Sequence, residues 1–95
     1  MLGINVTYIL KPGMRQAYLK ALADHGIQKS VQEEEGCIQY DFFLPVDKED
    51  ELLLVEKWTD RAAQKVHMTQ PHMAVYGEIK TRCATDNTVL EFYDF

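Results

Sequence analysis

Residues 37–58 have the sequence CIQYDFFLPVDKEDELLLVEKW. Two apolar stretches, 37–44 and 51–58, flank a short polar segment that begins with Pro45. Apolar runs on either side of a proline-containing turn are typical of a β-hairpin. We therefore expect two antiparallel strands. The residues expected to share one face of the first strand are Ile38, Tyr40, Phe42 and Leu44.

The segment before this hairpin has helical periodicity. From Met14 onward, apolar residues recur every three or four positions, which predicts an amphipathic helix. We expect it to continue irregularly past Gly26 to the acidic run Glu33–Glu35, which we interpret as a solvated helix end. Gly36 supplies the helix stop.

The segment after the hairpin predicts a second helical region. Thr59-Asp60 is a helix-capping pair, and an apolar stripe follows it as far as Pro71, which breaks or kinks the helix. A helix then resumes over residues 72–82. Alternating segments at 3–10 and 88–95 predict one strand at each end of the chain.

The resulting order, β-α-β-β-α-β, is that of the split βαβ, ferredoxin-like plan. We expect an α+β fold with a four-stranded antiparallel sheet, and a single domain over residues 1–95. The helices of such a fold cover one face of the sheet. Both phases of the third strand are apolar, Leu52 and Leu54 on one and Leu53 and Val55 on the other. We therefore expect a second copy to cover the open face, as a two-fold homodimer joined through the sheet faces.

Composition argues against several classes of protein. Ten basic and fifteen acidic side chains give a net charge of -5, which disfavours partnership with nucleic acid or an anionic membrane. The apolar runs are too short for a transmembrane helix or a signal peptide. The two cysteines, Cys37 and Cys83, lack metal-site spacing. We expect reduced thiols, a cytoplasmic protein and no metal site.

Three motifs together resemble one family. They are EGCxxYD from Glu35, EKWTDxxA from Glu56 and HxxxPH from His67, and a KPG turn from Lys11 accompanies them. In this order and spacing, they resemble the antibiotic biosynthesis monooxygenase (ABM) family over nearly the whole chain.

The resemblance implies a dimeric α+β barrel with a pocket between the sheet and the helices of each subunit. Members of the family include small oxygenases that act on phenols, anthrones or quinols without metal or flavin, and the pattern is most similar to the quinol monooxygenase branch. Heme-degrading members carry an axial histidine where this chain has Gly77. We therefore expect no cofactor.

His67 is the predicted catalytic residue. It shares an apolar helix stripe with Ala63 and Val66, so it should point at the sheet. A neutral imidazole there can take a hydroxyl proton from a phenol or quinol. The alternative is a structural histidine bonded to a backbone carbonyl or to Glu56. His25, on the stripe of the first helix, either enters the same pocket or lies at the surface beside Gly26.

Aromatic and polar residues complete the predicted substrate-binding set. Tyr40 can donate a hydrogen bond to a quinone oxygen, and Trp58 and Phe42 can pack against an aromatic ring as the apolar walls of the pocket. The alternative is that these aromatic residues only fill the core. Asn5 either lines the pocket or pairs across to a neighbouring strand. Glu56 is a candidate to orient a histidine or Arg82. His72 is a further candidate, with a capping or packing role as the alternative.

We expect a cofactor-independent monooxygenase that uses O2 to oxidise a small electron-rich aromatic, such as a quinol, a phenol or a polyketide-like compound. Phosphate-binding glycine loops, nucleophile elbows and paired catalytic carboxylates are absent from the motifs, which fits a substrate that supplies the reactivity. Two alternatives remain open. One is a non-catalytic, dimeric ligand-binding or stress-response domain, and the other is an isomerase of a small carbonyl metabolite.

Overall fold

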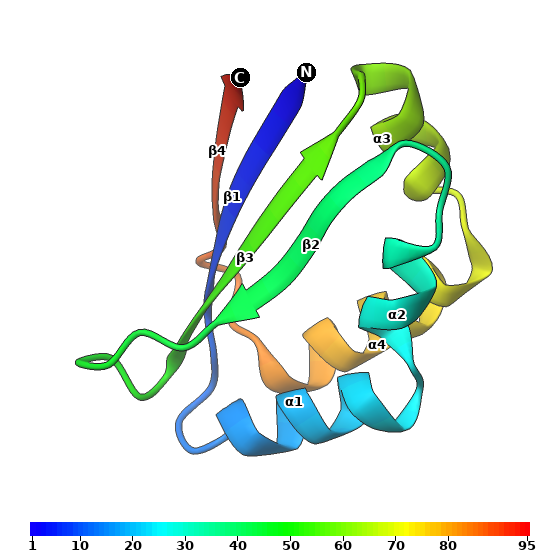
Figure 1. The fold of residues 1–95 in the computed structure, drawn as a ribbon. Helices are drawn as coiled ribbons and strands as arrows, with labels where there is room; N and C mark the ends of the chain where they lie inside the picture. The colour runs from blue at the N-terminus through cyan, green and yellow to red at the C-terminus, as the bar shows by residue number, and fades with distance from the viewer.

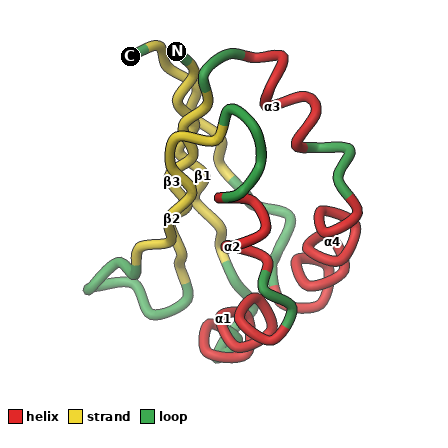
Figure 2. Tube along the Cα trace, turned by 45° about the vertical axis from the view of Figure 1, so that its right-hand side comes forward, coloured by secondary structure: helices red, strands yellow, loops and turns green.

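A four-stranded antiparallel sheet and a layer of helices on one of its faces form the structure (Figures 1 and 2). The computed structural model describes all 95 residues. The elements in chain order are β1 (Leu2–Ile9), α1 (Arg15–Asp24), α2 (Ile27–Gln32), β2 (Cys37–Phe43), β3 (Glu51–Trp58), α3 (Arg61–His67), α4 (Pro71–Cys83) and β4 (Val89–Asp94). The strand order is β2-β3-β1-β4. The α+β, ferredoxin-like fold predicted from the sequence is confirmed.

Each predicted helical region is divided in two, and one residue explains each division. Gly26 takes a left-handed conformation with φ +59 between α1 and α2, as glycine does at little steric cost. Pro71 occupies the first turn of α4, where its missing N–H would be unpaired in any case. Asp60 caps α3 by accepting a 2.8 Å hydrogen bond from the Ala63 N–H. The predicted capping and breaking roles are therefore confirmed.

The central strand β3 alternates cleanly between the two faces of the sheet. Its buried positions on the helix side are Leu52, Leu54, Glu56 and Trp58. The neighbouring strand β2 departs from simple alternation because its register with β3 shifts between Cys37 and Gln39. This bulge displaces Ile38, which is 48% exposed, and Leu44 lies beyond the end of the strand at 46% exposure. The expectation that Ile38 and Leu44 share one face of the strand with Tyr40 and Phe42 is wrong for this reason.

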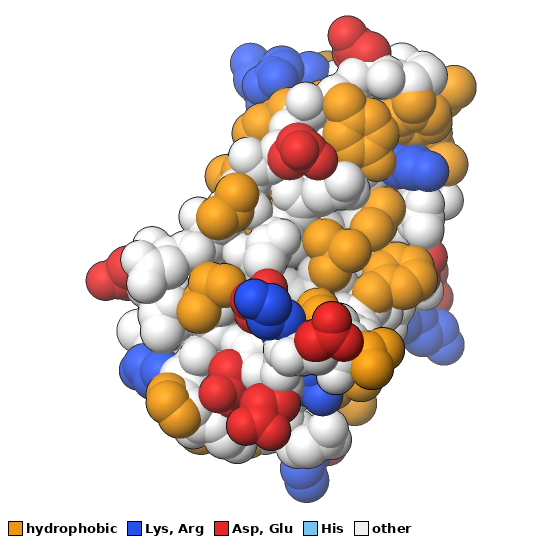
Figure 3. Space-filling view, turned by 90° about the vertical axis from the view of Figure 1, so that its left-hand side faces the viewer, with side chains coloured by type: hydrophobic (Ala, Val, Ile, Leu, Met, Phe, Trp, Pro, Cys, Tyr) orange, Lys and Arg blue, Asp and Glu red, His pale blue; other side chains and the backbone are white.

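The edge strand β4 is covered less than the others. On its helix-facing side, Leu90 pairs with Val6 and Phe92 pairs with Ile4, yet these two β4 residues remain 55% and 48% exposed. Viewed from the side of the molecule on which β4 lies, hydrophobic side chains are spread among charged ones (Figure 3). The uncovered strand leaves an apolar margin beside the space between sheet and helices.

A core of 17 residues fills the space between the two layers. At its centre, three tyrosine rings pack against one another with centroids 5.9 to 6.3 Å apart. Tyr18 from α1 donates a 2.7 Å hydrogen bond to the Tyr76 hydroxyl on α4, and Tyr8 on β1 completes the group. The core therefore includes polar atoms, and burial raises the pKa of Tyr8 to about 12.

The glycines directly before α2 and directly before β2 yield a matched stability prediction. Gly26→Ala should cost about 1–2 kcal/mol, because left-handed backbone is strained for alanine while the added Cβ meets open space. Gly36→Ala should cost more, in total about 2–5 kcal/mol, because its φ is +85 and the Cβ would also meet Ala63 and Thr59. Urea unfolding of both variants measures the difference. Equal losses would show that the close approach at Gly36 carries no extra free energy.

Candidate functional site

A cavity of about 320 Å³ lies between the sheet and the α3–α4 layer. It is lined by fourteen residues, nine of them hydrophobic, which come from all four strands or their flanks and from both helices. The five other lining residues carry polar or ionisable side chains: Glu56, Gln64, His67, Lys80 and Thr88. A small volume, mostly apolar walls and few polar groups are typical of a site for a small organic ligand.

His67 enters this cavity from the last turn of α3 and is 1% exposed. Its ring lies over Trp58, with centroids 4.7 Å apart, and meets the Tyr40 ring at 5.7 Å. Nδ1 lies 2.9 Å from the Glu34 Oε2 atom. With Nδ1–H donating to this carboxylate, Nε2 becomes the acceptor nitrogen of the neutral ring.

The Nε2 atom of His67 is open to a ligand. It makes no hydrogen bond within the protein. It is also not sealed inside the protein, because the only buried side-chain N or O atom without a hydrogen-bond partner is the Tyr40 hydroxyl oxygen. The imidazole is therefore held at one nitrogen and free at the other, which is the arrangement of a histidine that exchanges protons with a ligand.

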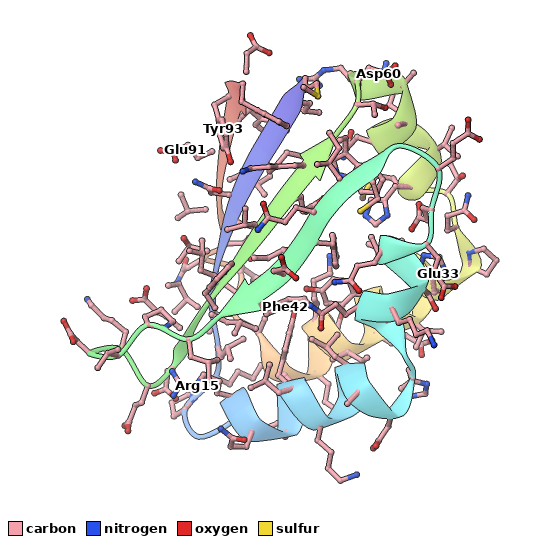
Figure 4. All side chains as sticks on the ribbon, viewed as in Figure 1. Arg15, Glu33, Phe42, Asp60, Glu91 and Tyr93 are labelled. Atoms are coloured by element: carbon pink, nitrogen blue, oxygen red, sulfur yellow. The ribbon has the colours of Figure 1, made fainter.

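Glu34 joins three helices at one corner of the helix layer. It follows the end of α2, and its Oε2 atom also lies 2.7 Å from Nε2 of His72 in the first turn of α4. Its side chain is 10% exposed, whereas Glu33 (labelled in Figure 4) and Glu35 are exposed. The expectation of a wholly solvated acidic run is therefore wrong at its central residue, because two imidazoles draw that carboxylate inward.

The same three side chains are the candidate metal ligands. One donor atom from each of Glu34, His67 and His72 lies within 4.8 Å of the others. Imidazole and carboxylate together suit zinc or iron by donor type. In this structure, however, the donors contact one another at hydrogen-bond distances of 2.7 and 2.9 Å. The expected absence of a metal site stays a prediction.

Glu56 is a buried acid on the floor of the cavity. It is 8% exposed and accepts a 3.1 Å hydrogen bond from the Trp58 indole N–H. Burial raises the pKa of its carboxyl, although the Trp58 hydrogen bond and the nearby His67 and Lys80 side chains oppose the rise. Trp58 itself is fully buried and does not line the cavity, so it supports His67 and Glu56 from behind.

Tyr40 lines the cavity, and Phe42 does not. The Tyr40 hydroxyl is sealed from solvent without a hydrogen-bond partner, and burial raises its pKa well above the usual value. Phe42, two residues further along β2 (Figure 4), packs edge-on against Tyr40 and borders a separate hollow beside Leu19 and Leu22 of α1. Phe42 therefore supports the Tyr40 ring from outside the cavity.

Asn5 and His25 lie away from the cavity. Strand alternation places Asn5 on the open face of β1, where it donates to Glu91 at 3.3 Å and accepts from the Tyr93 hydroxyl at 3.4 Å, both on β4 (Figure 4). His25 is exposed at the C-cap of α1, because Gly26 ends the regular helix directly after it. Of the predicted residues, the structure brings Tyr40, Glu56, His67 and, through Glu34, His72 together.

Comparison with known proteins identifies the family. The family model described as "Antibiotic biosynthesis monooxygenase" matches residues 1–78. The chain belongs to the ABM family. It is also 40% identical over 72 residues to a protein of Bacillus subtilis (strain 168) named "Putative monooxygenase YcnE", covering 76% of this chain and 74% of that protein.

Solved structures share the ABM fold along the whole chain. A crystal structure of an antibiotic biosynthesis monooxygenase matches with a TM-score of 0.87 at 20% identity, covering 100% of this chain and 98% of the other. Rv0793 of Mycobacterium tuberculosis matches with a TM-score of 0.84 at 22% identity, covering 99% and 93%. At such identities the likeness shows the fold alone. None of the helices is long and apolar enough to cross a membrane.

Sequence reasoning about this ABM chain missed three polar residues of the site, Glu34, Gln64 and Lys80. For Lys80 a signal was present: Met73, Tyr76 and Lys80 follow the three-then-four spacing of one helix stripe, so a charge falls where an apolar residue is expected. For Glu34 periodicity offers no signal, because it follows the end of α2. Its inward turn depends on histidines more than thirty residues away.

Glu56 yields a pH-dependent stability prediction. Because its pKa is raised in the folded state, the folded chain holds this proton more tightly than the unfolded chain. Wild-type stability should therefore fall, relative to Glu56→Gln, as the pH rises above about 4.3, the usual glutamate pKa. At pH 7 we expect the free energy of unfolding of Glu56→Gln to exceed that of wild type by about 1.4 kcal/mol for each unit by which the pKa is raised. Near pH 3, where Glu56 is protonated in both states, the two proteins should be about equally stable.

Urea unfolding of both proteins across this pH range measures the effect. Glutamine can still accept the Trp58 hydrogen bond, so the variant removes the charge with little change of shape. Glu33→Gln, at an exposed position, is the control and should follow the wild-type curve. A Glu56→Gln protein that is less stable than wild type at pH 7 would contradict the burial argument.

Proposed function

We propose that this ABM-family chain is a cofactor-independent monooxygenase that oxidises a small, electron-rich aromatic, such as a quinol or phenol, with O2. The observation that carries the proposal is the Glu34–His67 pair, in which a buried imidazole is bonded to a carboxylate at Nδ1 and is free at Nε2 beside an apolar cavity. The family model and the name of the relative agree with oxygenase chemistry at a coarser level.

In this mechanism, His67 is the base that removes a proton from the substrate. A substrate hydroxyl placed at Nε2 gives up its proton there, and the Glu34 carboxylate stabilises the imidazolium that forms. The hydrogen bond from His72 keeps Glu34 in place for this task. Glu34 and His72 are therefore positioning residues, and His67 is the base.

The substrate itself supplies the electrons. Once deprotonated, an electron-rich aromatic can reduce O2 directly. Over the whole reaction, the substrate loses two hydrogen atoms and gains one oxygen atom, and the second oxygen atom leaves as water. The four electrons that O2 accepts all come from the substrate, so the balance requires no metal or flavin. The apolar lining of the cavity excludes water from the reactive anion.

Tyr40 is suited to anchor the substrate. Its hydroxyl lacks a partner in the protein, and a buried donor of this kind gains a full hydrogen bond when a ligand oxygen arrives. Its raised pKa keeps the hydroxyl protonated and able to donate at neutral pH. Oxygen-bearing aromatics therefore fit this cavity better than plain hydrocarbons.

Replacing the base tests this mechanism directly. We expect oxygen uptake by chelator-treated protein on a panel of quinols and phenols, and we expect His67→Ala to lower kcat at least about 100-fold, the effect typical of losing a general base. Val66→Ala, exposed on the same helix, is the matched control and should retain wild-type turnover. Near-wild-type turnover by folded His67→Ala would remove His67 from the mechanism.

The same assay separates the alternatives. A non-catalytic binding domain would retain a ligand, detected as a thermal shift, and consume no oxygen. An isomerase of a small carbonyl compound would turn over without oxygen. Uptake abolished by the chelator and restored by a divalent metal would instead assign Glu34, His67 and His72 as metal ligands.

We also propose that the working unit is a homodimer joined through the open sheet faces. That face carries the apolar side chains of Leu53 and Val55 on β3, with Phe43 beside them at 47% exposure. A face of this kind on an isolated subunit would remain in water. A two-fold partner presents the same surface and covers it.

The mass in solution tests the dimer. Sedimentation should give twice the 11.0 kDa chain mass for wild type, and Leu53→Asp should shift the protein toward monomer by placing a charge in the interface. Val66→Asp, on the helix layer, should remain dimeric. A wild-type protein that sediments as a monomer at micromolar concentration would contradict this assembly.

A further inference from the structure

Lys80 presents an ammonium group to the cavity without a contact partner. It comes from α4 and is half-buried, and no carboxylate lies within 4.0 Å of its Nζ atom. The face of the Tyr76 ring lies beside it, with the ring centroid 4.7 Å from Nζ. Burial lowers the pKa of this lysine, which is the effect expected of an ammonium group removed from water without full compensation.

The nearby acid does not neutralise this charge by contact. Glu56 attracts Lys80 at longer range, but its carboxylate is engaged with the Trp58 indole N–H on β3. Two residues in the lining of the cavity therefore carry donors without acceptors, the ammonium of Lys80 and the hydroxyl of Tyr40. A ligand that supplies oxygen atoms to both would satisfy groups that the protein leaves open.

Lys80 lies toward the end of the cavity away from the His67 base. His67 stacks on Trp58, which pairs with Leu2 at the start of β1. Lys80 is one helical turn before Ala84, which bridges to Leu10 just beyond the other end of β1. The two groups also enter the cavity from different helices, α3 and α4. A ligand with one polar group at each end of an apolar body can therefore reach both.

We propose that Lys80 forms an anion-binding subsite and that the substrate is a hydroxylated aromatic acid, whose carboxylate binds Lys80 while its hydroxyl reaches His67. The part of this inference that concerns the hydroxyl rests on the proposed function, and the part that concerns the carboxylate does not. Lys80 is a specificity residue in this scheme, because it selects the substrate by charge and takes no part in proton removal. The aromatic body occupies the apolar walls between the two ends.

A matched ligand pair tests the subsite. 6-Hydroxy-2-naphthoate and 2-naphthol have the same ring system and differ in the carboxylate. Calorimetry under anaerobic conditions should give at least about tenfold tighter binding of the acid to wild type, since charge-assisted hydrogen bonds are the stronger ones. Lys80→Met should abolish this preference and leave 2-naphthol binding unchanged, because methionine keeps the apolar stem.

Two further variants keep the test decisive. Lys80→Arg retains the charge and should retain the preference for the acid. Lys65→Met removes a charge from an exposed position of α3 and should change neither affinity. Circular dichroism checks that each variant is folded. The subsite is overturned if wild type binds the two probes equally, if it binds neither, or if folded Lys80→Met still prefers the acid.

The Lys80 subsite and the oxygenase activity are contradicted by different results. Binding is measured without oxygen, so a protein that prefers the acid but never consumes O2 would retain the Lys80 subsite and lose the oxygenase. Conversely, oxygen uptake lost in His67→Ala, together with equal binding of both probes, would retain the oxygenase and remove the subsite. On an acidic substrate that is turned over, Lys80→Met should raise KM about tenfold with kcat within about twofold, the pattern of lost uniform binding.

Discussion

The shared carboxylate of Glu34 is the interaction on which the site depends. Three separate pieces of the helix layer, the end of α2, the end of α3 and the start of α4, meet at its Oε2 atom. Two charge-assisted hydrogen bonds hold them, and both lie in a partly buried setting where such bonds are strong. Because Glu34 binds Nδ1 of His67, it also determines that Nε2 is the ring nitrogen left free for a ligand in the cavity.

The cavity keeps polar groups that a purely structural core would avoid. Glu56 is a buried acid with a raised pKa, Lys80 is an ammonium without a contact partner, and the Tyr40 hydroxyl is unpaired. Each lowers the stability of the folded chain, since burying a charge, or a polar group without a partner, is unfavourable. Three such groups around one apolar space are best explained by a ligand that engages them.

Local chemistry accounts for how well the fold could be predicted. The proline-containing turn after Leu44, the capping Asp60 and the helix-breaking Pro71 act through neighbouring residues, so the order of elements follows from the sequence. The errors arose where pairing in space intervened. Ile38 left its expected face because of a register shift against β3, and Leu44 lay past the strand end. Neither event has a signature within the strand itself.

For this protein, the sequence by itself determined the α+β order of elements, the family and the inward direction of His67, because these depend on periodicity and short motifs. The tertiary structure alone decided which polar groups share the cavity. It brought Glu34 to His67 across 33 positions of the chain, placed Lys80 beside the Tyr76 ring and turned Asn5 to the other face of the sheet. The physical reason is that hydrogen bonds and burial depend on distance in space, which the packing of helices on the sheet sets and which no local pattern encodes.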